Sequence, residues 1–364
     1  MTEVAGAAPV RQEDAFDVER VATWLRENAS ATADLVGTPE VRQFMGGASN
    51  LTYLLRYAGG PASAGRDLIL RRPPTGTKAR GAHDMRREHD IQAALAPVFP
   101  VVPRMVAYCG DESVIGSEFY VMERIDGTIL RRDVPGELGL DREGVETLCR
   151  NAVDVLVALH DVDLEASGLA GLDRGDGYVR RQVEGWSGRY RRARTDDAGD
   201  FEATMAWLEA HQPDDRPHAL IHNDFRFDNL VLAPQDPTRV VGVLDWEMAT
   251  VGDPLMDLAS GLAYWVQADD PPAFLAMRRQ PTHTPGMLTR AEVVERYADA
   301  RGLGVSPRQW RFYEVFGAFR LAVIAQQIYY RFHHGQTSNP AYGEFREVVR
   351  FLDHRCAALV GAAS

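Results

Sequence analysis

The stretch IHNDFRFDNLVL, from Ile221 to Leu232, places polar and charged side chains between two apolar runs. Apolar ends predict burial, and burying charged or strongly hydrogen-bonding groups costs several kcal/mol unless each finds a partner. Asp224, Asp228 and Asn229 therefore need partners inside the fold. An arginine-rich interior can supply them, and so can a metal ion, so the chain must form one of these two environments.

Composition narrows the class of protein. A chain of 364 residues is long enough for two domains, or for two lobes that share a cleft. The net charge of −12 argues against general nucleic-acid binding. The longest uncharged part of the most apolar segment, LAVIAQQIYY, is far shorter than the ~20 residues that span a membrane, so no membrane partner is expected.

The first residues and the cysteines indicate a compartment. The first twenty residues lack an apolar signal segment and predict a short polar tail. Cys109, Cys149 and Cys356 are odd in number and widely separated, which indicates a reducing environment and no metal framework. We therefore expect a cytoplasmic protein.

The first part of the chain is rich in predicted strands. A helix is expected over 17–28 and another over 82–97. Strands are expected on both sides of a glycine turn at Gly46 and Gly47, again before Pro73, and over 118–127. These elements predict a small N-lobe over 1–123.

The remaining chain is mainly helical in its patterning. Apolar residues spaced by three and four predict a helix over 142–163, and further helices are expected near 179–194, 292–301, 308–334 and 343–360. The arginines of 179–194 are interpreted as a solvated helix face. Two strands, LIHNDF and VVGVLDWE, interrupt this C-lobe over 124–364. The predicted class is α+β, with two lobes.

The spacing of polar residues indicates phosphoryl transfer. Asn229 follows Asp224 by five positions, as in the H-R-D-x-x-x-x-N loop of kinases, and Asp245 ends the apolar strand VVGVLDWE. One loop and one strand end can bring a carboxylate to an acceptor hydroxyl while an amide oxygen and a second carboxylate face Mg²⁺. Arg226 can place a guanidinium near the transferring phosphoryl group. The buried polar groups would then be partnered by Mg²⁺, by phosphate and by one another.

HNDFRFDNLVL followed by VLDWEMATVGDPLMDLA resembles the aminoglycoside phosphotransferase family of small-molecule kinases. In particular it is similar to the branch that includes kinase-like domains fused to acyl-CoA dehydrogenases. The likeness covers roughly residues 40 to 330. It implies a bilobal protein-kinase-like fold and transfer of the γ-phosphoryl group of ATP to a hydroxyl of a small molecule. It assigns Asp224 as catalytic base, and Asn229 and Asp245 as Mg²⁺ ligands.

The resemblance also implies a nucleotide site in the N-lobe. Arg71 in LILRRPP stands where relatives have the lysine that holds the α- and β-phosphates, and Glu88 would be its ion-pair partner. Arginine is always charged and bidentate, so phosphate binding is retained while its geometry changes. The nucleotide-covering turn would be FMGGASNLTY, which lacks a full G-x-G-x-x-G and can also be an ordinary hairpin. The residues of this turn expected to contact nucleotide are Gly47, Ser49 and Asn50. In the hinge, the segment 122–125 whose backbone would meet adenine, they are Glu123 and Ile125.

Several other polar residues have a structural interpretation. Asn223 stands where many relatives have glycine, so the backbone before the base can differ. Asp228 and Asp253 are expected to cap or brace loops. His160 is expected to pack at a helix end and His222 to brace the loop. His333 and His334 have no third ligand nearby, so no metal site is expected there.

Three alternatives stay open for the function. A nucleotide-binding pseudokinase that acts as a sensor is compatible with Arg71 in place of lysine. A metal-dependent phosphohydrolase could use the H-x-D and D-W-E residues, although two-metal hydrolases usually need more ligands. The third is an aminoglycoside kinase proper.

Charge near the C-terminus bears on the acceptor. Residues 301–364 carry eight arginines against four acidic residues, a balance of +4 in a chain whose total is −12. A positive local potential repels cationic drugs and attracts carboxylates, phosphates or a coenzyme-A moiety. We therefore expect a neutral or anionic hydroxylated acceptor, for example a hydroxyacyl thioester.

Overall fold

The computed structural model describes residues 4, 6–29, 35–44, 50–59, 65–74, 84–337 and 339–362. The chain divides into two compact units, Met1–Asp126 and Gly127–Ser364, close to the boundary expected at 123/124. Gly47 and Ser49 of the expected nucleotide turn, and the only lysine, Lys78, lie outside the described residues.

The first unit contains a six-stranded antiparallel sheet with the order β1-β2-β3-β4-β6-β5. The strands are β1 (Ala7–Ala8), β2 (Glu40–Phe44), β3 (Leu51–Tyr57), β4 (Arg66–Arg72), β5 (Met105–Cys109) and β6 (Phe119–Glu123). Of these, β2, β3, β4 and β6 correspond to the predicted strands. β1 and β5 were not predicted.

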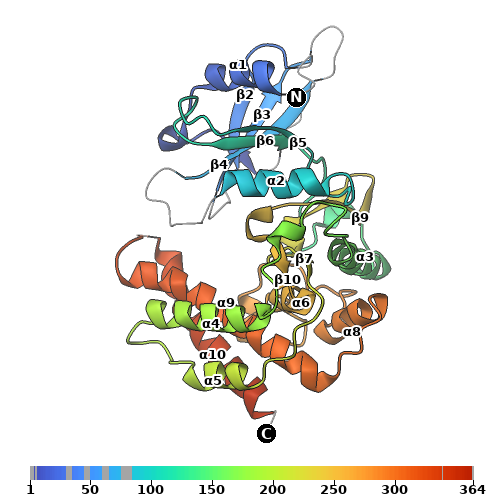
Figure 1. The fold of residues 1–364 in the computed structure, drawn as a ribbon, viewed down its shortest axis with the longest axis vertical. Coiled ribbons are helices and arrows are strands. Elements are labelled where there is room, and N and C mark those ends of the chain that lie inside the picture. Colours follow the sequence, from blue (N-terminus) through green and yellow to red (C-terminus); the bar gives the residue numbers. More distant parts are fainter. Residues whose placement is uncertain are drawn as a thin grey trace. The chain divides into compact units, whose positions relative to one another are not determined.

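Each face of this sheet packs against one helix, α1 (Val18–Asn28) or α2 (Met85–Leu95) (Figure 1). Side chains alternate between the faces of a strand. Accordingly, Tyr53 packs in the core cluster that contains Val21 and Leu25 of α1, while the next residue, Leu54, packs in the cluster that contains Met85 of α2. The sheet is therefore covered on both sides, which gives β4 two buried faces.

The predicted polar tail at the start of the chain is wrong for its later part. β1 pairs with β2, and a short 3-10 helix, Gln12–Asp14, follows. Asp14 is 5% exposed, accepts a hydrogen bond of 2.9 Å from Gln43 Nε2 and pairs with Arg11 at 2.7 Å. A polar segment packs in this way when its charges find partners, which local patterning does not reveal.

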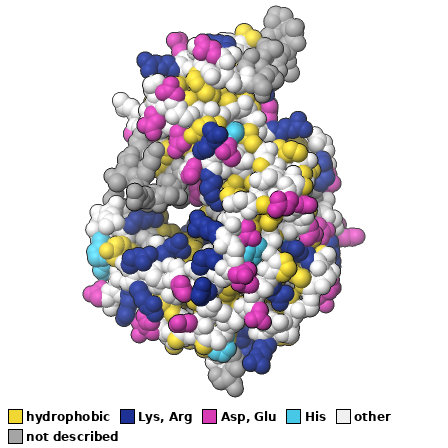
Figure 2. Space-filling model, viewed as in Figure 1, with side chains coloured by type: hydrophobic (Ala, Val, Ile, Leu, Met, Phe, Trp, Pro, Cys, Tyr) yellow, Lys and Arg dark blue, Asp and Glu magenta, His cyan; other side chains and the backbone are white. Residues whose placement is uncertain are grey.

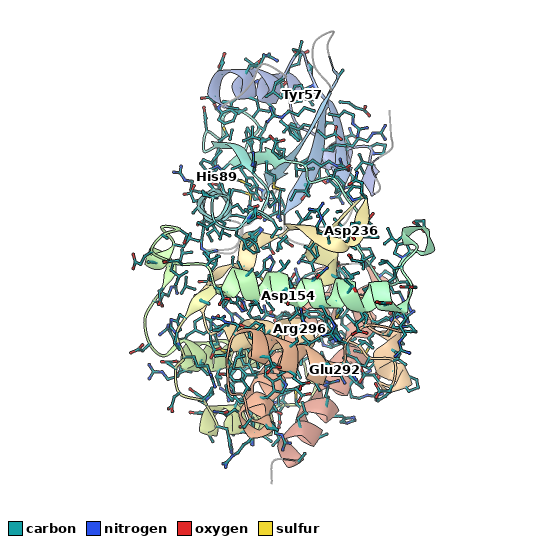
Figure 3. The ribbon with its side chains drawn as sticks, turned by 90° about the vertical axis from the view of Figure 1, so that its right-hand side faces the viewer. Tyr57, His89, Asp154, Asp236, Glu292 and Arg296 are labelled. Atoms are coloured by element: carbon teal, nitrogen blue, oxygen red, sulfur yellow. The ribbon has the colours of Figure 1, made fainter. Side chains whose placement is uncertain are left out.

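The second unit is mainly helical. Its longer helices are α3 (Arg142–His160), α4 (Tyr178–Ala193), α5 (Glu202–Ala210), α6 (Pro254–Leu262), α8 (Arg290–Ala300), α9 (Pro307–His333) and α10 (Phe345–Gly361), with the short α7 (Pro272–Ala276). The predicted helices are confirmed as α3, α4, α8, α9 and α10. An ion pair of 2.5 Å between Arg296 of α8 and Asp154 of α3 joins two of them (Figure 3). None of the described helices is long and apolar enough to cross a membrane.

Two small antiparallel ladders lie among these helices. β7 (Ala219–Ile221) pairs with β10 (Thr250–Gly252), and β8 (Leu230–Ala233) pairs with β9 (Asp236–Val243). The chain leaves β7 and enters β8 through residues 222–229, and it leaves β9 and enters β10 through residues 244–249. Both connections therefore run between the same two ladders.

Candidate active site

Strand register brings the two polar loops together. Ile221, the last residue of β7, is opposite Thr250, the first residue of β10. Leu230, the first residue of β8, is opposite Val243, the last residue of β9. Because each loop has one end in each ladder, 222–229 and 244–249 must lie side by side. Residues that are far apart in the sequence are therefore held next to one another.

Leu244 joins the two loops directly. Its backbone N–H donates to Asn229 O at 2.8 Å. Its carbonyl oxygen is 3.0 Å from Nε2 of His222, while Nδ1 of His222 accepts from the backbone N–H of Asp224 at 3.3 Å. Nε2 faces an acceptor and so carries the proton, while Nδ1 faces a donor and so does not, which defines a neutral imidazole protonated on Nε2. His222 therefore braces the loop as expected.

Asp245 follows this junction in an unusual backbone conformation. Its φ is 68° and its ψ 63°, in the left-handed region that residues with a Cβ rarely adopt. A non-glycine residue in this region is often found at a functional site. The backbone of Leu244 is hydrogen-bonded to Asn229. Asp245 is the next residue in the chain after Leu244. The expected pair of metal ligands is therefore held by adjoining backbone.

Asn229 has a fixed side-chain orientation. Its Nδ2 donates to the backbone oxygen of Asp224 at 2.9 Å and to Asp224 Oδ2 at 3.0 Å. Both partners are acceptors, so the amide nitrogen must point toward them. The amide oxygen, Oδ1, therefore points away from Asp224 and is the atom left to accept a cation or a donor.

Arg226 lies against the two aspartates of its own loop. Its guanidinium is 3.0 Å from each of the two Asp224 carboxylate oxygens and 3.3 Å from Asp228. It also lies over the ring of Tyr264, with Cζ 4.5 Å from the centroid. Burial would lower the pKa of Arg226, but the charges of Asp224 and Asp228 outweigh it and raise that pKa. The guanidinium thus orients the Asp224 carboxylate.

Asp228 braces this loop, as predicted, but incompletely. Burial raises the pKa of its carboxyl, and the opposing effect of Arg226 does not cancel the rise. One of its oxygens, Oδ1, has no hydrogen-bond partner among the described atoms. The loop therefore contains a carboxylate whose charge is only partly compensated by the described residues.

Asn223 occupies a backbone position that suits glycine. Its φ is 65°, in the left-handed region, where asparagine is tolerated better than most residues. Its Nδ2 donates to Met248 O in the neighbouring loop at 3.0 Å. Glycine, which the resemblance places here in many relatives, adopts this φ without strain. The substitution therefore leaves the backbone conformation available, and it adds a hydrogen bond between the two loops.

Asp257 of α6 anchors the start of the loop. Its carboxylate accepts from the backbone N–H groups of His222 and Asn223, both at 2.7 Å, and lies 3.0 Å from Nε2 of His160. Burial would raise the pKa of Asp257, but the hydrogen bond and charge of His160 outweigh it and lower that pKa. His160 also contacts Tyr297 Oη at 2.6 Å, so it is a packed helix-end histidine as predicted.

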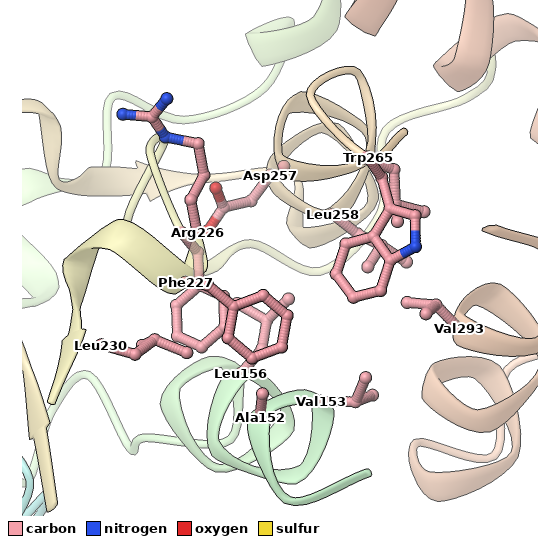
Figure 4. Close-up of a pocket in the computed structure, with 13 residues that line it drawn as sticks. Ala152, Val153, Leu156, Arg226, Phe227, Leu230, Asp257, Leu258, Trp265 and Val293 are labelled. Carbon is pink, nitrogen blue, oxygen red and sulfur yellow. The ribbon is translucent and has the colours of Figure 1, made fainter. Parts of the chain in front are cut away.

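An apolar cavity of about 30 Å³ lies under the loop (Figure 4). Phe227 and Leu230 from the loop side meet Leu156 of α3 there, and Trp265 closes another part of the lining. Figure 4 shows the guanidinium of Arg226 pointing away from these side chains. The apolar side chains of the loop thus pack into the core below it, while the charged groups lie on its other side. This arrangement explains how a segment with apolar ends can carry charged residues.

The first unit holds the second set of expected residues. Arg71 of β4 and Glu88 of α2 form an ion pair at 2.7 Å, with the two side chains 9% and 2% exposed. Tyr120 of β6 donates to Glu88 at 2.7 Å, and Asn50 Nδ2 is 3.4 Å from the other Glu88 oxygen. The ion pair that the resemblance implies is therefore present, and Asn50 joins it.

Strand alternation separates Arg71 from Arg72. Arg71 is opposite Tyr120 in the register and faces α2. Arg72 faces the other side, where it donates to Asp14 O at 2.7 Å and to Tyr53 Oη at 3.2 Å. Successive residues of a strand point to opposite faces, so only one of the two arginines can reach Glu88.

The expected hinge follows β6. The Glu123 carboxylate pairs with Arg66, and its backbone N–H donates to Arg104 O at 2.8 Å. Ile125, two residues later, is half-buried and outside regular structure. The hinge residues are therefore held at the end of the sheet.

Neither Asp257 nor Arg320 was assigned to the site from the sequence. Arg320 of α9 is 3% exposed and donates to Asn223 O at 2.8 Å. A charged residue within an otherwise apolar helix is the signal that could have identified both, because such a residue needs a buried partner.

Asp253 and His333 test two structural expectations. Asp253 caps α6 by accepting from Leu255 N at 2.7 Å, and it accepts from Tyr313 Oη at 3.0 Å, so its capping role is confirmed. The expectation that His333 has no further ligand nearby is wrong. Among the described residues, Asp196 and Asp197 lie close enough to share an ion with it. All three side chains are exposed, and Asp197 is already bonded to Tyr329 and Arg346.

Comparisons with known proteins agree with this geometry. Acyl-CoA dehydrogenase family member 10 of Mus musculus is 35% identical over 338 residues, which cover 92% of this chain and 30% of that protein. The chain thus spans about a third of the length of this relative. A crystal structure of a putative aminoglycoside phosphotransferase from Ralstonia eutropha superimposes with a TM-score of 0.79 at 29% identity, covering 96% of this chain and 100% of that chain.

A more distant structure shares the fold. A thermostable mutant of aminoglycoside phosphotransferase APH(4)-Ia, in a ternary complex with ADP and hygromycin B, has a TM-score of 0.55 at 16% identity, covering 94% of this chain and 99% of that chain. The predicted α+β, protein-kinase-like fold is therefore confirmed. Residues 40–312 match the family described as the phosphotransferase enzyme family, to which this chain belongs.

Proposed function

We propose that this protein transfers the γ-phosphoryl group of ATP to a hydroxyl group of a small molecule. The observation that carries the proposal is the junction of the two loops, where Asn229 is hydrogen-bonded both to Asp224 and to the backbone of Leu244, the residue before Asp245. Kinase chemistry needs one proton acceptor and two oxygen ligands at such a junction. Membership of a phosphotransferase family supports it.

The donor set fits Mg²⁺. Asn229 offers an amide oxygen whose direction is set by the bonds of Nδ2 to Asp224, and Asp245 offers a carboxylate. Mg²⁺ prefers hard oxygen ligands and usually takes one or two from the protein, with the rest from phosphates and water. Bound Mg²⁺ and ATP would supply the phosphoryl group and neutralise its charge.

Asp224 is the residue that accepts the proton. As the acceptor oxygen forms its bond to the γ-phosphorus, the bond from that phosphorus to the ADP oxygen breaks. The hydroxyl proton passes to a carboxylate oxygen of Asp224 and then to solvent, while ADP leaves with the electron pair of the broken bond. Arg226 holds the carboxylate in place, and its guanidinium is proposed also to face the transferring phosphoryl group.

Arg71 is proposed to bind the nucleotide phosphates, oriented by Glu88 and Asn50. A guanidinium binds phosphate oxygens through charge-assisted, often bidentate hydrogen bonds. Glu123 and Ile125 are proposed to meet adenine, and Gly47 and Ser49 to cover the nucleotide. Complexes of a family member with ADP support a nucleotide site of this kind.

For the acceptor we propose a neutral or anionic hydroxylated small molecule, for example a hydroxyacyl thioester. Nucleic acid and membrane are not proposed as partners, because the chain carries a net charge of −12 and no described helix can span a membrane. A cytoplasmic location is supported by three buried cysteines, each a free thiol.

The pseudokinase alternative follows from Arg71 in place of lysine, and one structural observation also bears on it. The guanidinium of Arg226 lies 3.0 Å from both carboxylate oxygens of Asp224, so it occupies some of the hydrogen-bond acceptor sites of the expected base. A carboxylate has about four acceptor sites, so this does not prevent proton transfer. Turnover measurements distinguish a pseudokinase from an active kinase.

The test is ATP consumption with and without an acceptor. A thermal-shift screen with Mg-ATP and a panel of alcohols, aminoglycosides and hydroxyacyl thioesters would first select binders. We expect ATP consumption only with a hydroxylated acceptor. Nucleotide binding without consumption would indicate a pseudokinase, and consumption without any acceptor would indicate a hydrolase. Phosphorylation of kanamycin-type compounds, with none of hydroxyacyl thioesters, would overturn the acceptor class.

A further inference from the structure

A group of arginines from α4 and α9 lies beside the catalytic loop in the second unit. Arg320 of α9 donates to the backbone oxygen of Asn223, the residue before Asp224, at 2.8 Å. Its guanidinium also lies over the indole ring of Trp186 of α4, with Cζ 5.1 Å from the ring centroid. Trp186 therefore connects α4 to the surroundings of Asp224.

A second guanidinium contacts the same indole ring. Cζ of Arg189 lies 4.5 Å from the Trp186 centroid. The charges of Arg189 and Arg320 are thus no more than about 10 Å apart, within one Debye length at 0.1 M salt. Arg192 follows Arg189 by three positions, and like charges at this helical spacing are mutually destabilising. Two helices therefore concentrate three positive charges at one place.

These arginines differ from most others in the chain. Among the described residues, no carboxylate lies within 4.0 Å of Arg189, Arg192 or Arg320, and the contacts of the buried Arg320 are a carbonyl oxygen, the Met248 sulfur and an aromatic ring. By contrast, Arg191 on the same helix pairs with Glu202 at 2.6 Å. Arg189 and Arg192 are exposed, whereas Arg320 is buried, and burying a cation without a counter-charge is costly, so an anion beside Arg320 would be stabilised.

Electrostatics at Arg189 agree with the geometry. Burial, followed by the charges of Arg192 and Arg320, lowers the pKa of Arg189. An arginine remains protonated despite such a shift because its pKa starts far above neutrality. The positive potential therefore persists, and an anionic ligand can relieve it.

The surface around these arginines is mixed in character. Figure 2 shows Lys and Arg side chains gathered over the part of the second unit where α4 and α9 lie. Met248, which follows Asp245 by three residues, is 38% exposed, and its sulfur is 3.9 Å from Arg320. An apolar side chain thus adjoins the positive charges next to the loop that carries Asp245.

We infer that Arg189 and Arg192, with Arg320 beneath them, bind an oxyanionic group of the acceptor, a carboxylate or a phosphate. The identification of this ligand as the acceptor rests on the proposed function, while the anion site itself does not. Guanidinium groups bind carboxylate and phosphate through paired, charge-assisted hydrogen bonds. Arg320 is hydrogen-bonded to Asn223, so the site adjoins the loop that carries Asp224.

Calorimetry with simple anions tests the site. The probes are 3-hydroxybutyrate, its uncharged methyl ester and inorganic phosphate, each titrated with Mg-AMP-PNP at saturation so that the nucleotide site is filled. The variants are the double substitution Arg189→Gln with Arg192→Gln, and Arg191→Gln as the matched control on the same helix. We expect at least one anion to bind the wild type, and the double variant to weaken that binding about tenfold or more. Arg191→Gln should leave it unchanged.

The two anions distinguish a carboxylate site from a phosphate site. If the double variant weakens the binding of 3-hydroxybutyrate, the site binds a carboxylate, and if it weakens the binding of inorganic phosphate, the site binds a phosphate. No anion binding, binding that survives the double substitution, or an equal affinity for the methyl ester would overturn the inference. Binding is measured without turnover. Anion binding without any phosphotransfer would therefore contradict the proposed function alone, and phosphotransfer that ignores these arginines would contradict the anion site alone.

Discussion

Asp224 and Asp245 lie in adjoining loops but have different surroundings. Asp224 is held by Asn229 and Arg226, whereas Asp245 lies in the second loop in a left-handed conformation. Loss of a positioned proton acceptor typically lowers a rate by ~10²–10⁴. Asp224→Asn should therefore depress turnover while Mg-ATP still binds, and Asp245→Asn should weaken the binding of Mg-ATP itself. Calorimetry on both variants checks this, and equal loss of nucleotide binding would refute the assignment.

Arg71, rather than Lys78, is expected to hold the nucleotide phosphates. Arg71 is fixed by its strand and by Glu88. Arg71→Ala should weaken ATP binding more than Lys78→Ala does. Because Arg71→Ala leaves Glu88 buried without its cation, Arg71→Lys serves as the second variant and should retain part of the affinity. A larger loss from Lys78→Ala in the same titrations would reverse the assignment.

At the scale of single residues, much of the site could be predicted because catalytic spacing is local. Asp224 to Asn229 and the following Asp245 are fixed by one loop and one strand end. Arg320 could not be placed, because its partner, Asn223 O, is a backbone atom 97 positions away. No sequence pattern specifies a side chain that bonds a distant carbonyl.

Among the elements, α6 positions the catalytic loop through Asp257. Asp257→Ala would leave two backbone N–H groups of the loop without their acceptor, as well as His160. Breaking a buried network of this kind should lower the free energy of unfolding by roughly 3 kcal/mol or more. Urea unfolding at neutral pH measures the loss, and an unchanged stability would contradict the anchoring role.

The pH dependence of the same variant has a defined sign. The folded-state pKa of Asp257 is lowered, so its stabilising contribution is fully present above the unfolded pKa of about 3.9 and is lost as pH falls through the folded value. The stability gap between the wild type and Asp257→Ala should therefore close in acid. A gap that widens toward low pH would show that the direction of the shift is wrong.

Helices α6 and α9 approach closely at Gly317. A Cβ at this position would lie 2.4 Å from Ala259 O, so Gly317→Ala should destabilise the fold despite the better helix propensity of alanine. Gly185 in α4 is the matched control, since a Cβ there meets only the end of Arg189 at 3.7 Å. Gly185→Ala should stabilise by about 0.5–1 kcal/mol. Unfolding midpoints that move in the same direction for both variants would contradict the packing.

Helices and strands whose apolar residues recur at regular spacing were predictable from the sequence, and the others were not. α3 was marked by its apolar spacing, and α9 by its long apolar stretch. α6 is buried on nearly every side, so it shows no polar face and no helical stripe. β8 and β10 have only four and three residues, too few for a pattern to appear. Their pairing is nevertheless what brings the two loops together.

For the whole molecule, the charge count near the C-terminus needs revision. Arg301, Arg346, Arg350 and Arg355 of that segment each pair with a carboxylate. Only the partners of Arg301 and Arg346 lie outside the segment, so part of its positive balance is compensated within the fold. Arg320 is the arginine of that segment that reaches the catalytic loop. Composition indicated an anionic preference, but only tertiary structure identifies the residues that could produce it.

The central claim is transfer of a phosphoryl group to a hydroxyl, and ³¹P NMR observes it directly. Wild-type protein is incubated with Mg-ATP and an acceptor selected by the binding screen. We predict a new phosphomonoester resonance that grows in step with ADP, and its loss in Asp224→Asn under conditions where Mg-ATP still binds. Conversion of ATP to ADP and inorganic phosphate with no ester, or an ester that forms equally well in Asp224→Asn, would contradict the account.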